Sequence, residues 1–253
     1  MKYQALKPVF DSDGFVVIRG FLSSDQLKRL KDNLDRYIHD VVPNLPDSDA
    51  FYDDKIRPGT LKQMQRIEQH DSWFAEYLRD PLWTETAGAL FGEPVRAPTG
   101  FEWFNKPPGT QHVTPPHQDN FYFCLMPPKV LTMWLALDPV DEENGCLRYI
   151  KGSHLHGLRP HNRTKTLGFS QGISDYGDAD RALEMPIPAQ PGDVLIHLGN
   201  TIHRADANRS ATRHRRSFGV VIEAQSCRRD EEAFETYLHA SKAQHQELGL
   251  KVS

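Results

Sequence analysis

The chain has 253 residues, of which 38% are hydrophobic, and a formal net charge of -4 at pH 7. This length supports one sizeable core, and the near balance of charges excludes a general attraction to nucleic acid or to an anionic membrane. Three cysteines without CxxC spacing, and the lack of a signal peptide or a membrane-spanning apolar run, favour a cytoplasmic protein with a small-molecule partner.

The N-terminal part, about residues 1–92, is predicted to be mainly helical. A short strand over 15–19 precedes a helix that begins near Ser23, because Ser23 and Gln26 have the spacing of a capping box. Leucine or isoleucine then recurs every three or four residues, so one face of this helix is predicted to pack on the core.

Two further segments complete this N-terminal part. A polar, proline-containing stretch from Pro43 to about Thr60 is predicted to be a long surface segment. A second helical region is predicted through residues 73–78, where aromatic and aliphatic side chains have helical spacing.

Short apolar runs separated by turn residues fill the region from about 95 to 224. Asn144 and Gly145 are predicted to form one of these turns, because both residue types tolerate a positive φ. Residues 157–181 are predicted to be a long insertion, and about 229–248 a charged C-terminal helix. Strands of this length and spacing predict a sandwich or barrel, within a single domain over 1–253. The predicted strands lie in the runs KVLTMWLALDPV, GCLRYIKGSH, GDVLIHLG and RRSFGVVIEA.

The stretch TPPHQDNFYF carries the first sign of a reactive site. On a strand, side chains two residues apart point the same way, so His117 and Asp119 are predicted to project together, with Phe121 and Phe123 on the same face. Two histidines and one carboxylate form the facial site typical of non-haem Fe(II) oxygenases. A third ligand must then come from another strand, and spacing alone leaves three candidates open, which are His197, His203 and His214.

An arginine-rich strand start lies close to these histidines in the sequence. Alternation places Arg215, Ser217 and Gly219 on one face, and Arg216 on the other. A guanidinium fork, a hydroxyl group and the gap beside a glycine together suit the binding of a carboxylate.

Several stretches taken in order resemble the phytanoyl-CoA dioxygenase family of Fe(II)/2-oxoglutarate-dependent oxygenases, from about residue 10 to residue 224. The resemblance implies a mainly β fold with flanking α-helices, whose core is a double-stranded β-helix of the jelly-roll or cupin-like kind. The stretches are DGFVVIRGFLSSDQL, FNKPPGTQHVTPPHQD, WLALDPVDEENGCLRYIKGSH, PGDVLIHLGNTIHRADANRS and RRS.

The resemblance also assigns the metal site. His117 and Asp119 match the family's first two iron ligands, and His203 matches its distal histidine. It therefore implies that His197 is an ordinary strand residue and that His214 lies on the surface.

The same resemblance assigns the residues that bind 2-oxoglutarate. Arg215 matches the arginine that binds its C5 carboxylate, and Ser217 completes an RxS pattern. Because Arg215 follows His203 by twelve residues where eleven is usual, Arg216 stays an alternative. Lys106, near the cosubstrate in many members, and Thr132 are further candidate cofactor contacts.

The implied activity is hydroxylation of an aliphatic C–H bond of a small molecule, with consumption of O2 and release of succinate and CO2. Retention of Asp119 argues against halogenation, for which related enzymes have a small residue there, whereas desaturation or cyclisation stays open. The alternative is a cupin-like metal-dependent hydrolase or isomerase, which does not use 2-oxoglutarate. Substrate choice is expected to depend on residues 52–65 and 158–180.

Overall fold

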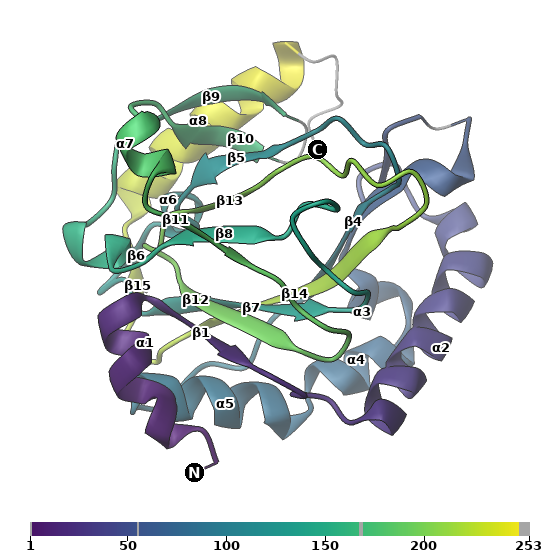
Figure 1. Cartoon of the computed structure of the whole chain (residues 1–253), viewed down its shortest axis with the longest axis horizontal. Helices are drawn as coiled ribbons and strands as arrows, with labels where there is room; N and C mark the ends of the chain where they lie inside the picture. Colours follow the sequence, from purple (N-terminus) through teal and green to yellow (C-terminus); the bar gives the residue numbers. More distant parts are fainter. Residues whose placement is uncertain (1, 55, 167–168, 248–253) are drawn as a thin grey trace.

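Two antiparallel sheets form the centre of the protein in a computed structural model that describes residues 2–54, 56–166 and 169–247 (Figure 1). The large sheet has seven strands, in the order β1 (Phe15–Ile18), β12 (Val194–Leu198), β7 (Val130–Ala136), β14 (Arg215–Glu223), β4 (Phe101–Lys106), β3 (Leu61–Gln65) and β2 (Ala50–Tyr52). The small sheet has four, in the order β11 (Glu184–Ile187), β8 (Leu147–Ile150), β13 (His203–Ala205) and β5 (Thr114–His117). Two short pairs complete the strands, β9 (His161–Thr166) with β10 (Phe169–Ile173) and β6 (Leu125–Met126) with β15 (Arg228–Arg229).

Helices cover the outer face of the large sheet (Figure 1). The α-helices are α1 (Lys7–Asp13), α2 (Ser24–Asp40), α3 (Ile67–His70), α4 (Ser72–Leu78), α5 (Pro81–Phe91), α6 (Asn120–Phe123), α7 (Asp178–Arg181) and α8 (Glu231–Glu247). The 3₁₀ turns are Gln4–Leu6, Val42–Asn44, Pro58–Thr60 and Ser153–His156. None of the helices in the described part of the chain is both long and apolar enough to cross a membrane.

Alternation along the strands separates an apolar core from a polar interior. In β14, Phe218 and Val220 pack with the helices in the main hydrophobic cluster. Ser217 and Gly219, on the opposite face, point between the two sheets as predicted. The same alternation in β12 sends Ile196 to the helical side and His197 to the interior. The space between the sheets can therefore hold polar chemistry without disturbing the main core.

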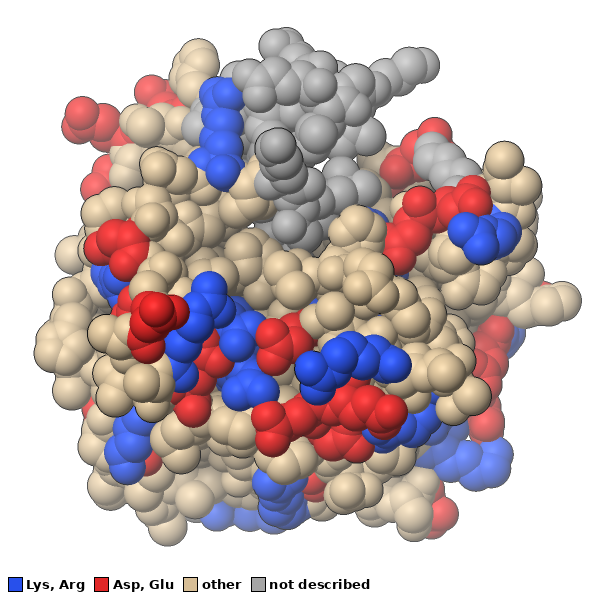
Figure 2. All heavy atoms as spheres, turned by 45° about the horizontal axis from the view of Figure 1, so that its top comes forward, with Lys and Arg blue, Asp and Glu red and all other residues tan. Residues whose placement is uncertain are grey.

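Ion pairs fix the outer face of the small sheet. Arg204 on β13 pairs with Glu184 on β11 at 2.6 Å, and Arg148 on β8 pairs with Asp206 at 2.9 Å. Figure 2 shows basic and acidic side chains side by side across one face of the molecule. Because outward and inward side chains alternate, this outer network also fixes the residues that face inward, among them His203.

Several sequence-based predictions agree with these elements. The strand at 15–19 corresponds to β1, and the helix after Ser23 is α2, whose capping box with Gln26 is present. The helical region at 73–78 is α4, and α8 occupies the predicted C-terminal helix as far as residue 247. The last residue of that prediction, 248, lies outside the described part of the chain.

The prediction of a simple surface segment over residues 43–60 was wrong. Ala50–Tyr52 forms β2, which pairs with β3 and extends the large sheet at its edge. Ala50 and Asp49 are buried there, although prolines and aspartates dominate the surrounding sequence. The insertion at 157–181 likewise contains the β9–β10 hairpin and α7. Pairing between strands that are neighbours in the chain orders both stretches, and local composition carries no sign of it.

Gly145 occupies a turn that requires glycine, as its predicted role implied. Its φ is +83°, and a Cβ atom there would lie 2.5 Å from the carbonyl oxygen of Asp206. Asp206 follows β13 directly, so this contact ties the turn after β7 to the strand that carries His203.

We predict that Gly145→Ala lowers the free energy of unfolding by about 2 kcal/mol or more, because it combines a left-handed backbone with a clash against main-chain atoms. Gly177→Ala is the matched control, since φ is -129° and nothing lies within 4 Å of the added Cβ. Urea unfolding followed by circular dichroism measures both. Equal destabilisation by the two variants contradicts this account of the turn.

Candidate metal centre and carboxylate pocket

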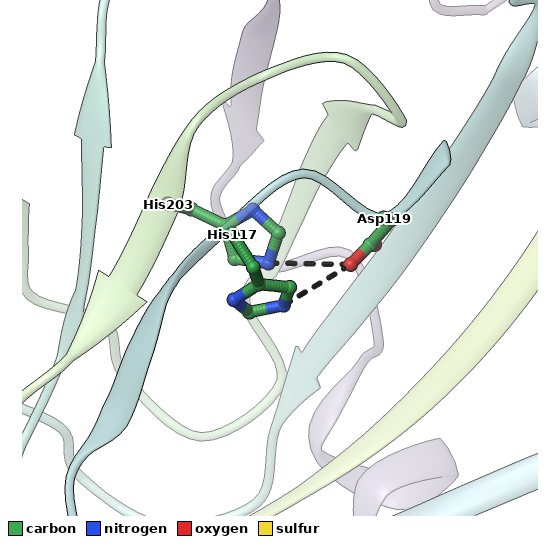
Figure 3. Close-up of side chains that lie close together, drawn as sticks. All are labelled: His117, Asp119 and His203. Carbon is green, nitrogen blue, oxygen red and sulfur yellow. Dashed lines mark ion pairs between the residues drawn. The ribbon is translucent and has the colours of Figure 1, made fainter. Parts of the chain in front are cut away.

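Three buried side chains from separate segments converge between the sheets (Figure 3). The ligand atoms of His117, Asp119 and His203 all lie within 4.8 Å of one another. The Nε2 atoms of His117 and His203 lie 3.3 and 3.5 Å from the same oxygen, Oδ1 of Asp119. Two imidazole nitrogens and one carboxylate oxygen around a common point match the facial set of a non-haem iron site.

Strand pairing explains why the two histidines meet. His203 on β13 is the cross-strand partner of His117 at the end of β5, and the ring centroids are 4.1 Å apart. Asp119 reaches the site differently from the prediction. β5 ends at His117, and Asp119 lies in the helical region as the residue before α6. The predicted continuation of the strand was therefore wrong, and Phe121 and Phe123 belong to α6 rather than to a strand face.

Backbone carbonyls determine which nitrogen of each histidine faces the site. Nδ1 of His117 contacts the carbonyl oxygen of Pro115 at 2.8 Å, and Nδ1 of His203 contacts that of Thr201 at 3.0 Å. A carbonyl accepts only from a protonated nitrogen, so in the neutral rings Nε2 carries the lone pair. Burial and the neighbouring histidines lower the pKa of His203 well below its ordinary value, which favours the neutral form that a metal requires.

The second oxygen of Asp119 is held by the large sheet. Thr132 donates to Oδ2 at 2.5 Å, and Nε2 of His197 contacts the same atom at 3.1 Å. Tyr149 in turn contacts Nδ1 of His197 at 2.9 Å. Burial alone would raise the pKa of Asp119, but the surrounding histidines outweigh it and keep that pKa well below its ordinary value. The carboxylate is thus ionised and oriented, with Oδ1 left toward His117 and His203.

Gln118 lies between the two ligands in the chain and faces the other way. Its side-chain amide donates to the carbonyl oxygens of Gly157 at 2.8 Å and Asn200 at 2.7 Å, and its carbonyl accepts from the backbone of Arg159 at 2.8 Å. Its own backbone N–H donates to His161 at 3.2 Å. Gln118 therefore fastens the start of the 157–181 insertion to the segment that carries the ligands.

Arg215 and Ser217 form a buried polar pair without partners inside the same interior. Nε of Arg215 and Oγ of Ser217 are buried and make no hydrogen bond to any residue that the structure describes. Arg215 is 3% exposed, and its guanidinium lies 5.4 Å from the ring centre of Trp134. Burial lowers the pKa of Arg215 to about 10, which still leaves it charged at neutral pH. Unsatisfied buried donors of this kind suit an anionic ligand with two carboxylate oxygens.

Arg216 is engaged elsewhere. It faces the opposite side of β14 and binds Asp138 through both Nε and an Nη atom, at 2.9 and 2.8 Å. It is not among the residues that line the interior cavity. Of the two arginines, Arg215 therefore has the geometry for an internal ligand.

Lys106 and Thr132 have protein partners. Burial and the nearby Arg215 lower the pKa of Lys106 well below its ordinary value. Its ammonium group donates to the backbone carbonyls of His112, Ala205 and Asp206. Thr132 contacts Asp119, as described above. Both residues line the cavity, and their contact with a cosubstrate stays a prediction.

The spacing of the sequence left three histidines as candidates for the third metal ligand, and the structure places each of them differently. His203 joins the metal set, whereas His197 supports Asp119 from the neighbouring sheet. His214 is half-buried at the start of β14, with Nδ1 3.2 Å from Asn105. The supporting role of His197 was missed, although a histidine within the apolar strand VLIHL was a usable signal, because a buried polar side chain requires partners.

A cavity of about 910 Å³ connects these groups. It reaches from Arg215 past His117, Asp119 and His203 to side chains of β3 and β4. Its apolar lining includes Phe104, Tyr122, Phe123, Leu125, Val130 and Val221. The volume is that of a site for a small molecule rather than for a polymer.

Comparison with known proteins identifies the family. A model of the phytanoyl-CoA dioxygenase (PhyH) family matches residues 10–217. Phytanoyl-CoA dioxygenase 1 of Oryza sativa subsp. japonica is 25% identical over 251 residues, with 86% of this chain and 88% of the relative covered.

Solved structures agree with this match in fold. The epimerase SnoN, crystallised with Fe3+, alpha ketoglutarate and nogalamycin RO, superposes with a TM-score of 0.70 at 20% identity, covering 89% of this chain and 85% of SnoN. EvdO2 from Micromonospora carbonacea var. aurantiaca, complexed with 2-oxoglutarate, gives 0.68 at 24% identity, with 88% and 91% covered. These neighbours confirm the predicted jelly-roll core. Because the family model spans most of the sequence, the chain belongs to the phytanoyl-CoA dioxygenase family.

Proposed function

We propose that this protein is an Fe(II)- and 2-oxoglutarate-dependent dioxygenase that hydroxylates an aliphatic C–H bond of a small molecule. The observation that carries the proposal is the pairing of two features in one cavity. One is the set of His117, Asp119 and His203, and the other is the unpartnered Arg215, with the buried and unpartnered Ser217 two residues further along the same face of β14. The first suits iron and the second suits the far carboxylate of 2-oxoglutarate. A metal-dependent hydrolase or isomerase would have no use for the second.

The donor atoms fit this cofactor pair. His117, Asp119 and His203 would hold the iron and leave coordination positions for other ligands. When bound, Fe(II) and 2-oxoglutarate activate O2, with formation of succinate and CO2 and transfer of one oxygen atom to the substrate. Arg215 and Ser217 would orient the cosubstrate by binding its C5 carboxylate. Thr132 and His197 would keep Asp119 aimed at the metal.

We propose hydroxylation rather than halogenation because Asp119 supplies a carboxylate to the metal set, where related halogenases have a small residue. SnoN, which has a similar fold, is an epimerase, so this fold also supports reactions other than hydroxylation. The apolar side chains around the site would exclude water and position the C–H bond to be oxidised. A cytoplasmic location stays a prediction of the sequence.

We expect anaerobic addition of Fe(II) and 2-oxoglutarate to the purified protein to produce the weak visible absorption band of the iron–cosubstrate chelate. His117→Ala removes one of the ligands and is expected to abolish the band, while circular dichroism reports whether the variant remains folded. Iron binding without a band in the unmodified protein would favour the hydrolase or isomerase alternative and contradict the proposal.

Arg215→Ala is expected to weaken 2-oxoglutarate binding about 10- to 100-fold, because a charge-assisted bidentate contact is lost. Arg216→Ala is the neighbouring control. It breaks the pair with Asp138 and is expected to lower stability while leaving 2-oxoglutarate affinity within about twofold. Titration of the visible band gives both affinities. The assignment fails if Arg216→Ala has the larger effect on 2-oxoglutarate.

Removal of the support behind Asp119 is expected to weaken the metal site without removing a ligand. His197→Ala and Thr132→Val should each reduce Fe(II) affinity about 10-fold or more, as loss of outer-shell hydrogen bonds typically does. His197→Gln, which retains a side-chain donor, should restore part of the affinity. Competition with a metal-binding dye measures these values. An unchanged affinity in His197→Ala would show that Asp119 needs no support from β12.

A further inference from the structure

The carboxylates that line the cavity differ in whether a positively charged side chain pairs with them. The cavity-lining carboxylates are Asp53, Glu68, Glu102, Asp119 and Glu223. Asp53 pairs with Lys62 at 3.3 Å, and Glu223 pairs with Arg96 at 3.0 Å.

Two of the others also have strong partners. Asp119 lies among the histidines of the metal set, and Glu68 accepts from the backbone N–H of Phe101 at 3.1 Å. Glu102 is the exception. It forms no ion pair with any residue in the described ranges, and its contacts are two long ones of 3.5 Å from the side-chain amides of Gln63 and Gln65.

The side chain of Glu102 can be reached from the cavity, but its carboxylate is poorly hydrated. It is exposed to the cavity rather than packed, yet the protein around it desolvates its carboxylate. Burial, with a smaller effect of the negative Asp119, raises the pKa of Glu102 to about 7. Arg66 and the side-chain amide of Gln63 lower this pKa, but they do not offset the effect of burial. Glu102 thus resembles Arg215 in the same cavity, because neither forms a contact ion pair with any residue that the structure describes.

Strand geometry separates Glu102 from Arg215. Arg215 pairs across the strands with Lys106, and Glu102 lies four residues from Lys106 on the same face of β4. At about 3.3 Å per residue, that separation is about 13 Å along the strand. The anion-binding groups and Glu102 therefore occupy different parts of one cavity.

The ring of Phe104 packs against the backbone opposite Glu102. Its partners across the strands are Gly219 on β14 and Gln65 on β3. Gly219 has no side chain, and an added Cβ would lie 3.1 Å from the ring of Phe104. Phe104, two residues from Glu102, places an aromatic ring on the same wall. A carboxylate and an aromatic ring on one wall suit a positively charged nitrogen.

We propose that Glu102 is a specificity residue that binds a protonated amine or quaternary ammonium group of the substrate. This inference rests on the proposed function, because it takes Arg215 and the metal set to be occupied by 2-oxoglutarate and iron. The cationic group binds the carboxylate of Glu102 beside Phe104, and the remainder of the substrate extends along the cavity toward the metal set. The assignment narrows the substrate class to small molecules that carry a positive charge.

The test compares three probes of equal length, hexylammonium, hexan-1-ol and hexanoate, by calorimetric titration into the full chain. The titrations are performed anaerobically, both with Fe(II) and 2-oxoglutarate present and without them. We expect hexylammonium to bind about tenfold or more tightly than hexan-1-ol under both conditions, and hexanoate to bind more weakly than either when 2-oxoglutarate occupies Arg215.

Glu102→Gln removes the charge with little change of shape and is expected to abolish the preference for hexylammonium. Its affinities for hexan-1-ol and for 2-oxoglutarate should stay within about twofold of the unmodified protein. Glu85→Gln is the control for net charge, since Glu85 is exposed on α5 and does not line the cavity. Glu223→Gln is the control for a cavity carboxylate that already has a cationic partner. Both controls should keep the preference.

Thermal unfolding separates a binding role from a structural one. An uncompensated carboxylate does not stabilise the fold, so Glu102→Gln should unfold at the same or a higher temperature. Glu102→Met serves as a second variant if the glutamine variant does not fold.

The outcomes distinguish the two proposals. A hexylammonium preference that survives in Glu102→Gln, or an ammonium probe that binds no better than the alcohol, overturns the inference about Glu102. If the chelate band forms normally in that case, the proposed function stands. A missing band together with a Glu102-dependent ammonium preference contradicts the proposed function alone and supports the cation site.

Discussion

The carboxylate of Asp119 is the contact on which the rest of the site depends, because it joins the two sheets through their inner faces. One oxygen faces the histidines of the small sheet, and the other is held by Thr132 and His197 of the large sheet. A buried carboxylate is tolerated only when such partners compensate its charge. A shift of one sheet relative to the other would therefore also change the geometry of the metal set.

Alternation along the strands lets a polar site and an apolar core share the same sheet. In β14, Phe218 and Val220 stabilise the fold against the helices, while Arg215 and Gly219 face the cavity. A slip of one residue in register would exchange these roles and bury arginine in the core. Stability of the outer layer and chemistry of the inner layer thus depend on the same pairing of β14 with β7 and β4.

The sequence was sufficient for the parts that depend on local spacing and on family motifs. It predicted the capped helix α2, the jelly-roll core and the alternation of β14. It failed where a short strand is ordered at the edge of the sheet by pairing with its neighbour, as in β2, and where a strand ends early, as at His117. The roles of His197 and Glu102 were also missed, because a single polar residue in a strand does not say which distant group it will face.

The attachment of the 157–181 insertion by Gln118 bears on how this scaffold diversifies. Both contacts that the Gln118 side chain makes with the insertion are with backbone atoms, of Gly157 and Arg159. Backbone atoms are the same whatever side chain a position carries. The side chains at positions 157 and 159 can therefore change without loss of these two contacts, whereas the contact of His161 with the backbone of Gln118 depends on its side chain. New substrate contacts can thus arise beside an unaltered metal set as long as His161 is kept.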